Sequence, residues 1–490
     1  MSKIAIIGAG LSGLTAAIYL KEQGHDVCIY EKNDYVGGRL ISKEGKETYF
    51  ENYIRGLAGC SKNDKMYEVW EHIGAIKDTK FIRLKRFHSV KSGNDELVLW
   101  RDTQRSKKEM IARSPEDEEQ ITNLLDAVAS FGIERINVKK PIDMTNQFEL
   151  MAGGVVSGNA NKKLDSYENM TIGELAAKFN DPLIRLAIIS LMGTDAKAYE
   201  FIAAYGNFVA ANAEIPIGGF LTIAKNIENK FKAMGGKIFL NCEIVKADIK
   251  NKRVISIESA DEKTVTADAY IFAADANYVF MNLLGEKHMQ RDMKKAFSGT
   301  KDFKVETVFG LSFLFEGKTE SMYSNGALET DAFMLGKDMR SIINYRLYDY
   351  DKTMENESAT RLFCFVRQDE EDYLYWKSIS IDKESLEAAA MQAAENIKFR
   401  IEEAFPDTKN KLKILKCYTP IYFEENYNSY LGAKSGFCPG KKTGNYNVSG
   451  NIKGIKNAFL AGSFLGGVTG IRGAVISGKF AALRMLKVLK

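Results

Sequence analysis

A glycine-rich turn near the start of the chain constrains the fold more than any other feature. Gly8, Gly10 and Gly13 follow an almost wholly apolar run at residues 4–7, which is typical of a strand buried on both faces of a parallel sheet. A helical pattern leads from the turn to Gly24, and a second strand at residues 26–30 delivers an acid eighteen residues after Gly13. Strand, glycines, helix, strand and acid in this order predict a dinucleotide-binding βαβ unit.

Each part of this unit has a physical role in holding a dinucleotide. The first glycine permits a tight turn, the second lets a pyrophosphate approach the N–H groups of the helix start, and the third lets helix and strand pack closely. The acid, Glu31, is placed to accept from a ribose hydroxyl, and its charge repels a 2′-phosphate, which argues against NADP. The loop positions that we predict to bind the cofactor are Gly8, Gly10, Leu11, Ser12 and Gly13.

The segment after Glu31 favours FAD over NAD. Gly37 and Gly38 form a second glycine pair, and Arg39 follows them directly. This segment resembles the GG-R motif of FAD-binding oxidoreductases, in which the loop returns to the pyrophosphate and the arginine adds positive charge. We therefore predict that Glu31, Lys32, Gly37, Gly38 and Arg39 contact FAD.

The far end of the chain carries a second glycine-rich turn. Residues 457–463 read as a strand that ends in glycine, and residues 466–474 open a helix that runs to about residue 488. The positive end of such a helix favours negative charge on a reduced flavin. We predict that this end of the chain binds the cofactor through Gly462, Gly470, Ile471 and Ala474.

Taken together, the pattern predicts an α/β fold of the two-dinucleotide-binding type. Residues 237–240 and 268–275 read as further strands of the first sheet, so this Rossmann-like parallel sheet belongs to a discontinuous FAD domain. A mixed α+β substrate domain fills the gaps, because 490 residues are too many for one compact core. The expected FAD domain comprises residues 1–100, 216–290 and 430–490, and the expected substrate domain comprises residues 101–215 and 291–429.

Composition and charge argue against several other classes of protein. Lysine plus arginine exceed aspartate plus glutamate by only 68 − 64 = 4, which gives no argument for nucleic acid. The six cysteines show no C-x-x-C pair and the four histidines no i, i+4 spacing, so we expect neither disulfides nor a metal site. No run reaches the roughly 18–20 apolar residues of a membrane span, and the first strand leaves no room for a secretory leader. We expect a cytoplasmic protein, and the basic residues 83–86 and C-terminal helix leave a peripheral membrane contact open.

These motifs together resemble the phytoene desaturase and retinol saturase group, the carotenoid-type members of the flavin amine oxidase superfamily. The resemblance spans nearly the whole chain. Besides the glycine motifs it includes residues 170–185, 216–219, 267–275, 402–406, 419–420, 432 and 461–478. It implies non-covalent FAD, a lipophilic small-molecule substrate, and backbone hydrogen bonds from Val245 to the adenine.

The chain departs from the group in a segment expected near the flavin. Many relatives carry a His-Trp pair where this sequence has Arg55 and Gly56. Arg472 is a second unusual cation, because positive charge in the first turn of a helix opposes the helix dipole. If both arginines face the flavin, an acidic substrate such as a fatty or polyene carboxylate is favoured. An Arg472 that extends into solvent is the structural alternative.

The resemblance implies hydride transfer at flavin N5 to or from a C–C bond of an isoprenoid, polyene or fatty-acid-like substrate. Desaturation, saturation and isomerisation share these motifs, so the direction of the reaction stays open. A flavin amine oxidase that acts on a C–N bond is the alternative, and a protein that binds FAD without catalysis is a third. The sequence singles out no catalytic acid or base.

Overall fold

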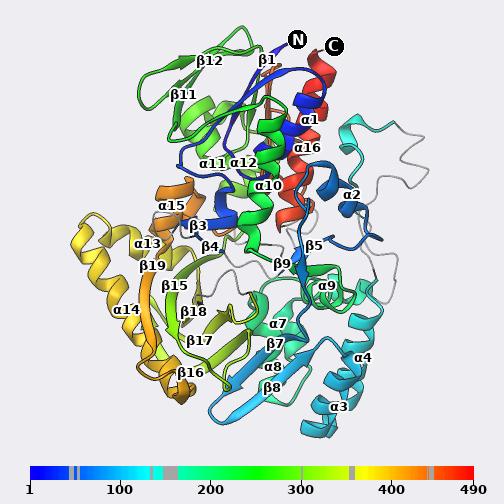
Figure 1. Ribbon diagram of the computed structural model, residues 1–490, viewed down its shortest axis with the longest axis vertical. Helices are drawn as coiled ribbons and strands as arrows, with labels where there is room; N and C mark the ends of the chain where they lie inside the picture. Colours follow the sequence, from blue (N-terminus) through cyan, green and yellow to red (C-terminus); the bar gives the residue numbers. More distant parts are fainter. Residues whose placement is uncertain are drawn as a thin grey trace.

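The computed structural model describes residues 1–43, 49–51, 56–132, 136–146, 164–299, 302–351, 359–438, 440, 446–468 and 470–489. Its elements form an upper and a lower half along the longest axis of the molecule, and both ends of the chain lie in the upper half (Figure 1). Each half is built on its own large sheet.

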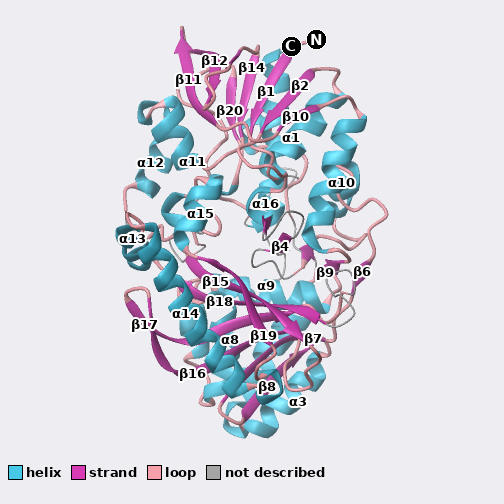
Figure 2. Cartoon of the chain, turned by 60° about the vertical axis from the view of Figure 1, so that its left-hand side comes forward, coloured by secondary structure: helices cyan, strands magenta, loops and turns pink. Residues whose placement is uncertain are grey.

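The upper half contains a five-stranded parallel sheet of β10 (Lys237–Phe239), β2 (Asp26–Tyr30), β1 (Lys3–Ile7), β14 (Ala269–Phe272) and β20 (Ala458–Leu460), in this order (Figure 2). Ile4 and Ile6 of β1 face one hydrophobic core, and Ala5 and Ile7 face another, so β1 is buried on both faces as predicted. The chain order reverses at β1, because β2 and β10 extend the sheet on one side and β14 and β20 on the other. A ligand crevice is expected outside the carboxyl end of a strand in this position.

Different layers cover the two faces of the parallel sheet. One face packs against α1 (Leu11–Glu22), α2 (Lys65–His72), α10 (Gly219–Ala233) and α16 (Gly470–Leu489). The other packs against antiparallel β11 (Ile244–Lys250), β12 (Arg253–Ser259) and β13 (Thr264–Val265), with α11 (Ala276–Tyr278) and α12 (Arg291–Phe297). A Cβ atom on Gly478 would lie 2.1 Å from the backbone oxygen of Ser12, so α16 and α1 pack backbone against backbone.

The lower half is built on a seven-stranded sheet in which β7 and β16 pair in parallel and the other neighbours are antiparallel. Its strands are, in order, β19 (Leu412–Tyr418), β15 (Thr307–Glu316), β18 (Ala359–Gln368), β17 (Asp338–Leu347), β16 (Asn325–Leu335), β7 (Arg86–Ser92) and β8 (Asp95–Trp100). One face packs against α13 (Glu370–Ile379) and α14 (Lys383–Ala404). The other packs against α3 (Thr103–Arg113), α4 (Glu118–Ala129), α7 (Ile172–Ala176), α8 (Pro182–Met192) and α9 (Ala198–Val209).

Short elements connect the halves. They are the pair β3 (Ile41–Lys43) and β4 (Tyr49–Glu51), the strands β5 (Leu57–Ala58), β9 (Ala213–Pro216) and β6 (Phe81–Ile82), and the helix α15 (Pro420–Tyr427). The short helix α6 (Asp165–Glu168) packs in the lower half. The predicted α/β class, with a discontinuous parallel sheet and a mixed second half, is confirmed. Residues 86–100 belong to the lower sheet because β7 pairs with β16, whereas the division made from sequence grouped residues 1–100 with the FAD domain. We propose that the substrate domain takes in residues 86–100.

Candidate functional site

A cavity of about 1830 Å³ lies where the carboxyl edge of the parallel sheet faces the lower half. Ligand pockets usually measure about 300–1,000 Å³, so this one has room for a dinucleotide and a second molecule. The turn after β1 and the start of α16 line its upper part, and the lower sheet with α8 and α9 lines the rest. The N-terminal end of α16, which begins at Gly470, points to the middle of the molecule, away from the chain terminus (Figure 2).

The three glycines of the first turn differ in their surroundings. A Cβ on Gly8 would lie 2.7 Å from the backbone oxygen of Ala273, and one on Gly13 would lie 2.0 Å from that of Gly8. A Cβ on Gly10 would meet only the Cα of Gly38, at 4.0 Å, and Gly10 lines the cavity. The first and third glycines are thus required by protein packing, whereas the bare backbone at Gly10 leaves space for a ligand.

The start of α1 suits an anion. Leu11 and Ser12 line the cavity, and Gly10, the N-cap of α1, offers no side chain to its first N–H groups. The first turn of α1 holds no acidic residue that would neutralise the helix dipole. An uncapped helix start beside a bare glycine fits the pyrophosphate of FAD.

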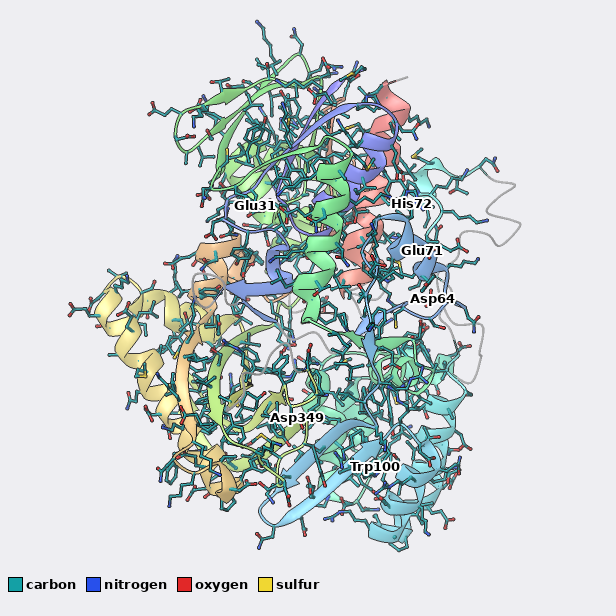
Figure 3. All side chains as sticks on the ribbon, viewed as in Figure 1. Glu31, Asp64, Glu71, His72, Trp100 and Asp349 are labelled. Atoms are coloured by element: carbon teal, nitrogen blue, oxygen red, sulfur yellow. The ribbon has the colours of Figure 1, made fainter. Side chains whose placement is uncertain are left out.

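Glu31 follows β2 at the end of the sheet that faces the lower half, and Figure 3 labels it there. Its Oε2 accepts from the Ala9 N–H at 2.7 Å, and its Oε1 accepts from the Asn33 N–H at 2.9 Å. Burial raises the pKa of Glu31, and these hydrogen bonds oppose that rise. Oε1 also accepts from Asn33 Nδ2 at 3.2 Å, whereas Oε2 keeps further acceptor capacity. The same group can therefore order the glycine turn and bind a ribose hydroxyl. Lys32, next to it, donates from Nζ to Asn428 Oδ1 at 2.8 Å.

The second glycine pair packs on the first turn. The Gly37 N–H donates to the Ala9 oxygen at 2.9 Å, and a Cβ on Gly38 would lie 3.2 Å from the Cα of Gly10. Arg39 then reaches toward the C-terminal part of the chain. It donates to Ser463 Oγ at 2.8 Å, to the Ala433 oxygen at 3.2 Å and to the Ser435 oxygen at 3.3 Å.

Asp275, which follows β14 and caps the start of α11, is a site residue for which we predicted no role. It is buried on the cavity wall 3.7 Å from the Arg39 guanidinium. Burial raises the pKa of Asp275, and the Arg39 charge opposes that rise. Its Oδ2 also accepts from the Tyr430 N–H at 3.2 Å. An acid three residues after a sheet strand was the available signal, because side chains that follow strand ends meet at the ligand edge.

The C-terminal turn reaches the same cavity. Gly470 begins α16 with a left-handed φ of +66°, and the Gly462 N–H donates to Ser477 Oγ at 3.0 Å. The predicted residues that line the cavity here are Gly462, Gly470, Ile471, Arg472 and Ala474. Arg472 is partly buried in the first turn of α16. Arg55, its proposed counterpart, lies outside the described residues.

The structure bears on two further residues named from the sequence. The Val245 side chain is 39% exposed and does not line the cavity, whereas the preceding residue, Ile244, is buried and does. The expected contact with the adenine is made by the backbone of Val245, so it remains a prediction. Arg484, which we counted with a basic surface, is buried and forms an ion pair with Asp143 at 2.7 Å. Its charge is neutralised inside the protein, so it adds nothing to a lipid-binding face.

The lower wall holds a charged cluster that gave no signal in the sequence. Glu306, directly before β15, accepts from Lys434 Nζ at 2.7 Å and from Nη1 of Arg367, and all three residues line the cavity. Burial alone would raise the pKa of Glu306, but Arg367 and Lys434 together hold it below the ordinary 4.5. More than sixty residues separate any two of the three, so only the fold brings them together.

One acidic group resembles a metal site. The carboxylates of Asp338, Asp369 and Asp372 lie within 4.8 Å of one another. Arg340 pairs with all three, at 3.6 Å from Asp338, at 4.0 Å from Asp369 and in a hydrogen bond to Asp372. This is the arrangement of an ion-pair cluster around an arginine. All six cysteines are free thiols.

Two helix starts that face one cavity, at the point where a parallel sheet reverses its order, are the arrangement of a dinucleotide-binding protein. Residues 11–486 match the family described as flavin containing amine oxidoreductase, and the chain belongs to this family. It is an FAD-dependent oxidoreductase. The glycine turn, the uncapped start of α1 and the large cavity fit this cofactor.

Curated relatives support the desaturase-like resemblance. The 4,4′-diapophytoene desaturase (4,4′-diaponeurosporene-forming) of Staphylococcus aureus strain Newman is 24% identical over 532 aligned residues, which cover 99% of this chain and 99% of the relative. The protein of the same name from the bovine strain RF122 / ET3-1 is 25% identical with the same coverage.

Solved structures share the fold at lower identity. An oxidoreductase from Methanosarcina mazei aligns with a TM-score of 0.57 and 15% identity, over 97% of this chain and 99% of that one. Wild-type putrescine oxidase bound to putrescine aligns with a TM-score of 0.57 and 14% identity, over 99% of both chains. None of the helices in the described part of the chain combines the length and apolarity needed to cross a bilayer.

Proposed function

We propose that this enzyme desaturates, saturates or isomerises a C–C bond of a lipophilic isoprenoid, polyene or fatty-acid-like substrate. FAD, when bound, supplies the hydride acceptor or donor at its N5 atom. The full-length similarity to a 4,4′-diapophytoene desaturase supports a substrate of this class.

The observation that carries the proposal is the apolar lining of the lower part of the cavity. It consists of side chains from the lower half, among them Leu84, Phe87, Ile189, Leu191, Met192 and Phe208. An apolar chain gains about 25 cal/mol for each Å² that such a surface removes from water. A substrate bound there would lie between the lower sheet and the cofactor turns.

The chain's own residues orient the reactants and exclude water. Arg39 ties the glycine turns to the 433–435 and 463 segments, both of which lie toward the other end of the chain. We propose that the start of α16 and Arg472 stabilise negative charge on the reduced flavin. Arg55, in a segment expected near the flavin, remains the proposed partner for an acidic substrate group.

C–N oxidation is the second candidate, because the family includes amine oxidoreductases and the fold resembles putrescine oxidase. An amine substrate is an ammonium ion at neutral pH and is bound best by an available carboxylate. Along the lower wall, Glu306 is engaged by two cations, Asp195 by Lys304 at 2.6 Å, and Asp369 by Arg340. Because protein cations already engage these three carboxylates, they are not available to bind an ammonium ion, and this favours the C–C reaction.

Product analysis distinguishes the two candidates. The holoenzyme is incubated with a polyene hydrocarbon, a polyene alcohol, an unsaturated fatty acid and a set of primary amines, and the products are examined by mass spectrometry. We expect polyene or fatty-acid products changed by two hydrogen atoms, or isomerised at unchanged mass. Aldehyde from an amine, with every polyene and fatty acid unchanged, would establish C–N oxidation instead.

A further inference from the structure

The polar side chains on the lower cavity wall differ in whether the protein supplies them with a hydrogen-bond partner. Asn207 donates to the Ala203 oxygen at 2.7 Å, Ser190 Oγ bonds to His88 Nε2 at 2.8 Å, and Asn325 Oδ1 accepts from Arg346 at 2.9 Å. These three groups have protein partners. Within the described residues, neither amide atom of Asn344 has a hydrogen-bond partner.

Asn344 lies in the middle of the lower sheet. It is 2% exposed, lines the cavity and belongs to β17, two residues from Ile342, which lines the same cavity. Its neighbours across the sheet are Ala327 of β16 and Phe365 of β18, both apolar. A buried amide in such surroundings is costly unless a group from outside the protein hydrogen-bonds it.

Arg367 supplies a second donor close by. It follows Phe365 by two residues on β18, so it lies diagonally across from Asn344 on the same face, where Cα atoms are roughly 7–8 Å apart. Its two terminal nitrogens donate to Glu306 and to the Leu191 oxygen, which fixes the guanidinium. In the described part of the chain its Nε has no hydrogen-bond partner.

We propose that Asn344 and Arg367 bind an oxygenated end group, a hydroxyl or a carboxyl, on the lipophilic substrate. This inference rests on the proposed C–C function and names the substrate class more narrowly. The end group donates to Asn344 Oδ1 or accepts from its Nδ2, and it accepts from Arg367 Nε. A pure hydrocarbon leaves these groups unsatisfied, so the wall selects against it.

The test compares ligands on the holoenzyme. Binding of a polyene alcohol, its methyl ether, the matching carboxylic acid and the parent hydrocarbon is followed by the change in the flavin absorption spectrum. The alcohol or the acid should bind about ten-fold or more tightly than the hydrocarbon. Asn344→Leu, which keeps the approximate volume, should abolish this preference.

Thermal unfolding without ligand provides an independent readout. Because Asn344 has no partner to lose, Asn344→Leu should raise the melting temperature. The matched control is Asn325→Leu, which loses the bond from Arg346 and should lower the melting temperature while the end-group preference remains. A destabilised or unfolded Asn344→Leu protein would show a structural role for Asn344 and overturn the inference.

Arg367→Gln separates the two end groups. A larger loss of affinity for the acid than for the alcohol identifies a carboxylate, and an equal loss identifies a hydroxyl. Equal binding of hydrocarbon, alcohol and acid by the unchanged enzyme would overturn the inference and leave the C–C function standing. Binding of none of them, with bleaching of the flavin by amines, would overturn both.

Discussion

At the scale of single residues, Gly10 is the sharpest probe of the cofactor site. Its φ of −71° is open to any residue, and a Cβ there meets nothing closer than 4.0 Å, so the apoprotein should accept a side chain. We expect Gly10→Val to remove FAD almost completely, because the side chain fills the space of the pyrophosphate. The free energy of unfolding of the apoprotein should change by less than about 1 kcal/mol. FAD released by heat and urea unfolding of the apoprotein measure the two effects.

Gly13→Ala is the matched control, because its Cβ would lie 2.0 Å from the Gly8 oxygen. It should destabilise the apoprotein itself, by about 1–3 kcal/mol. A Gly10→Val protein that retains one FAD per chain would show that the pyrophosphate lies elsewhere.

Arg472 is a second residue with a specific expected effect. Its side chain lines the cavity at the start of α16, where it adds positive charge beside the proposed position of the flavin. Arg472→Met should lower the two-electron midpoint potential of bound FAD. The shift is about 30 mV for each 1.4 kcal/mol by which the reduced flavin loses stabilisation. Arg253→Met, an exposed change on β12, should leave the potential unchanged. A potential that is equal in all three proteins would exclude a role for Arg472 at the flavin.

At the scale of elements, the contact between α1 and α16 joins the two helix starts that face the cofactor. Gly478 allows it, since a Cβ there would lie 2.1 Å from the Ser12 oxygen. We expect Gly478→Ala to separate the helices, to lower the free energy of unfolding by about 1–3 kcal/mol and to weaken FAD binding. Lys487→Ala, on the exposed side of α16, is the control. Unchanged FAD affinity in Gly478→Ala would mean that the two helix starts act independently.

Elements with local signals could be predicted from the sequence. The strand ending at Ile7, the helix ending before Gly24 and the strand ending at Tyr30 agree with the structure, because short-range periodicity and glycine positions determine them. Long-range pairing could not be predicted. The β7–β8 hairpin is formed by local contacts, but it joins the lower sheet through pairing with β16, which lies more than 230 residues later in the chain.

The same limit explains what the sequence missed at the site. Arg39 belongs to a motif that the sequence shows, but its partners Ser463 and Ala433 lie about 390 or more residues away and could not be predicted. Asn344 occupies an ordinary position in a strand, and only the fold shows that its amide is buried without a partner among the described residues. The side chains of Val245 and Ile244 face opposite sides of β11, and the backbone contact of Val245 with the adenine remains a prediction.

At the scale of the whole molecule, Glu306 links the lower sheet to the 434 segment of the chain through Arg367 and Lys434. Because its pKa is held below 4.5, this carboxylate stabilises the fold above that pH, and the contribution is lost as the pH falls through the lowered pKa. Glu306→Gln should cost roughly 1–3 kcal/mol at pH 7 and flatten the acid dependence of stability below pH 4.5.

Urea unfolding between neutral pH and acid measures this effect. Glu371→Gln is the control, since its pair with Lys337 is well exposed and solvent screens it. If both variants show the same acid profile as the unchanged protein, Glu306 does not stabilise the junction.

The central claim is that bound FAD exchanges a hydride with a C–C bond of a lipophilic substrate. The most direct test is to mix the enzyme with polyenes under anaerobic conditions and to follow the flavin absorbance. The experiment is started once with the oxidised enzyme and once with the reduced enzyme. Our account predicts that a polyene bleaches the oxidised flavin, restores the colour of the reduced flavin, or is isomerised with no net change in flavin absorbance. Polyenes that leave the flavin unchanged in both states and are recovered without isomerisation, while a primary amine bleaches it, would contradict the account.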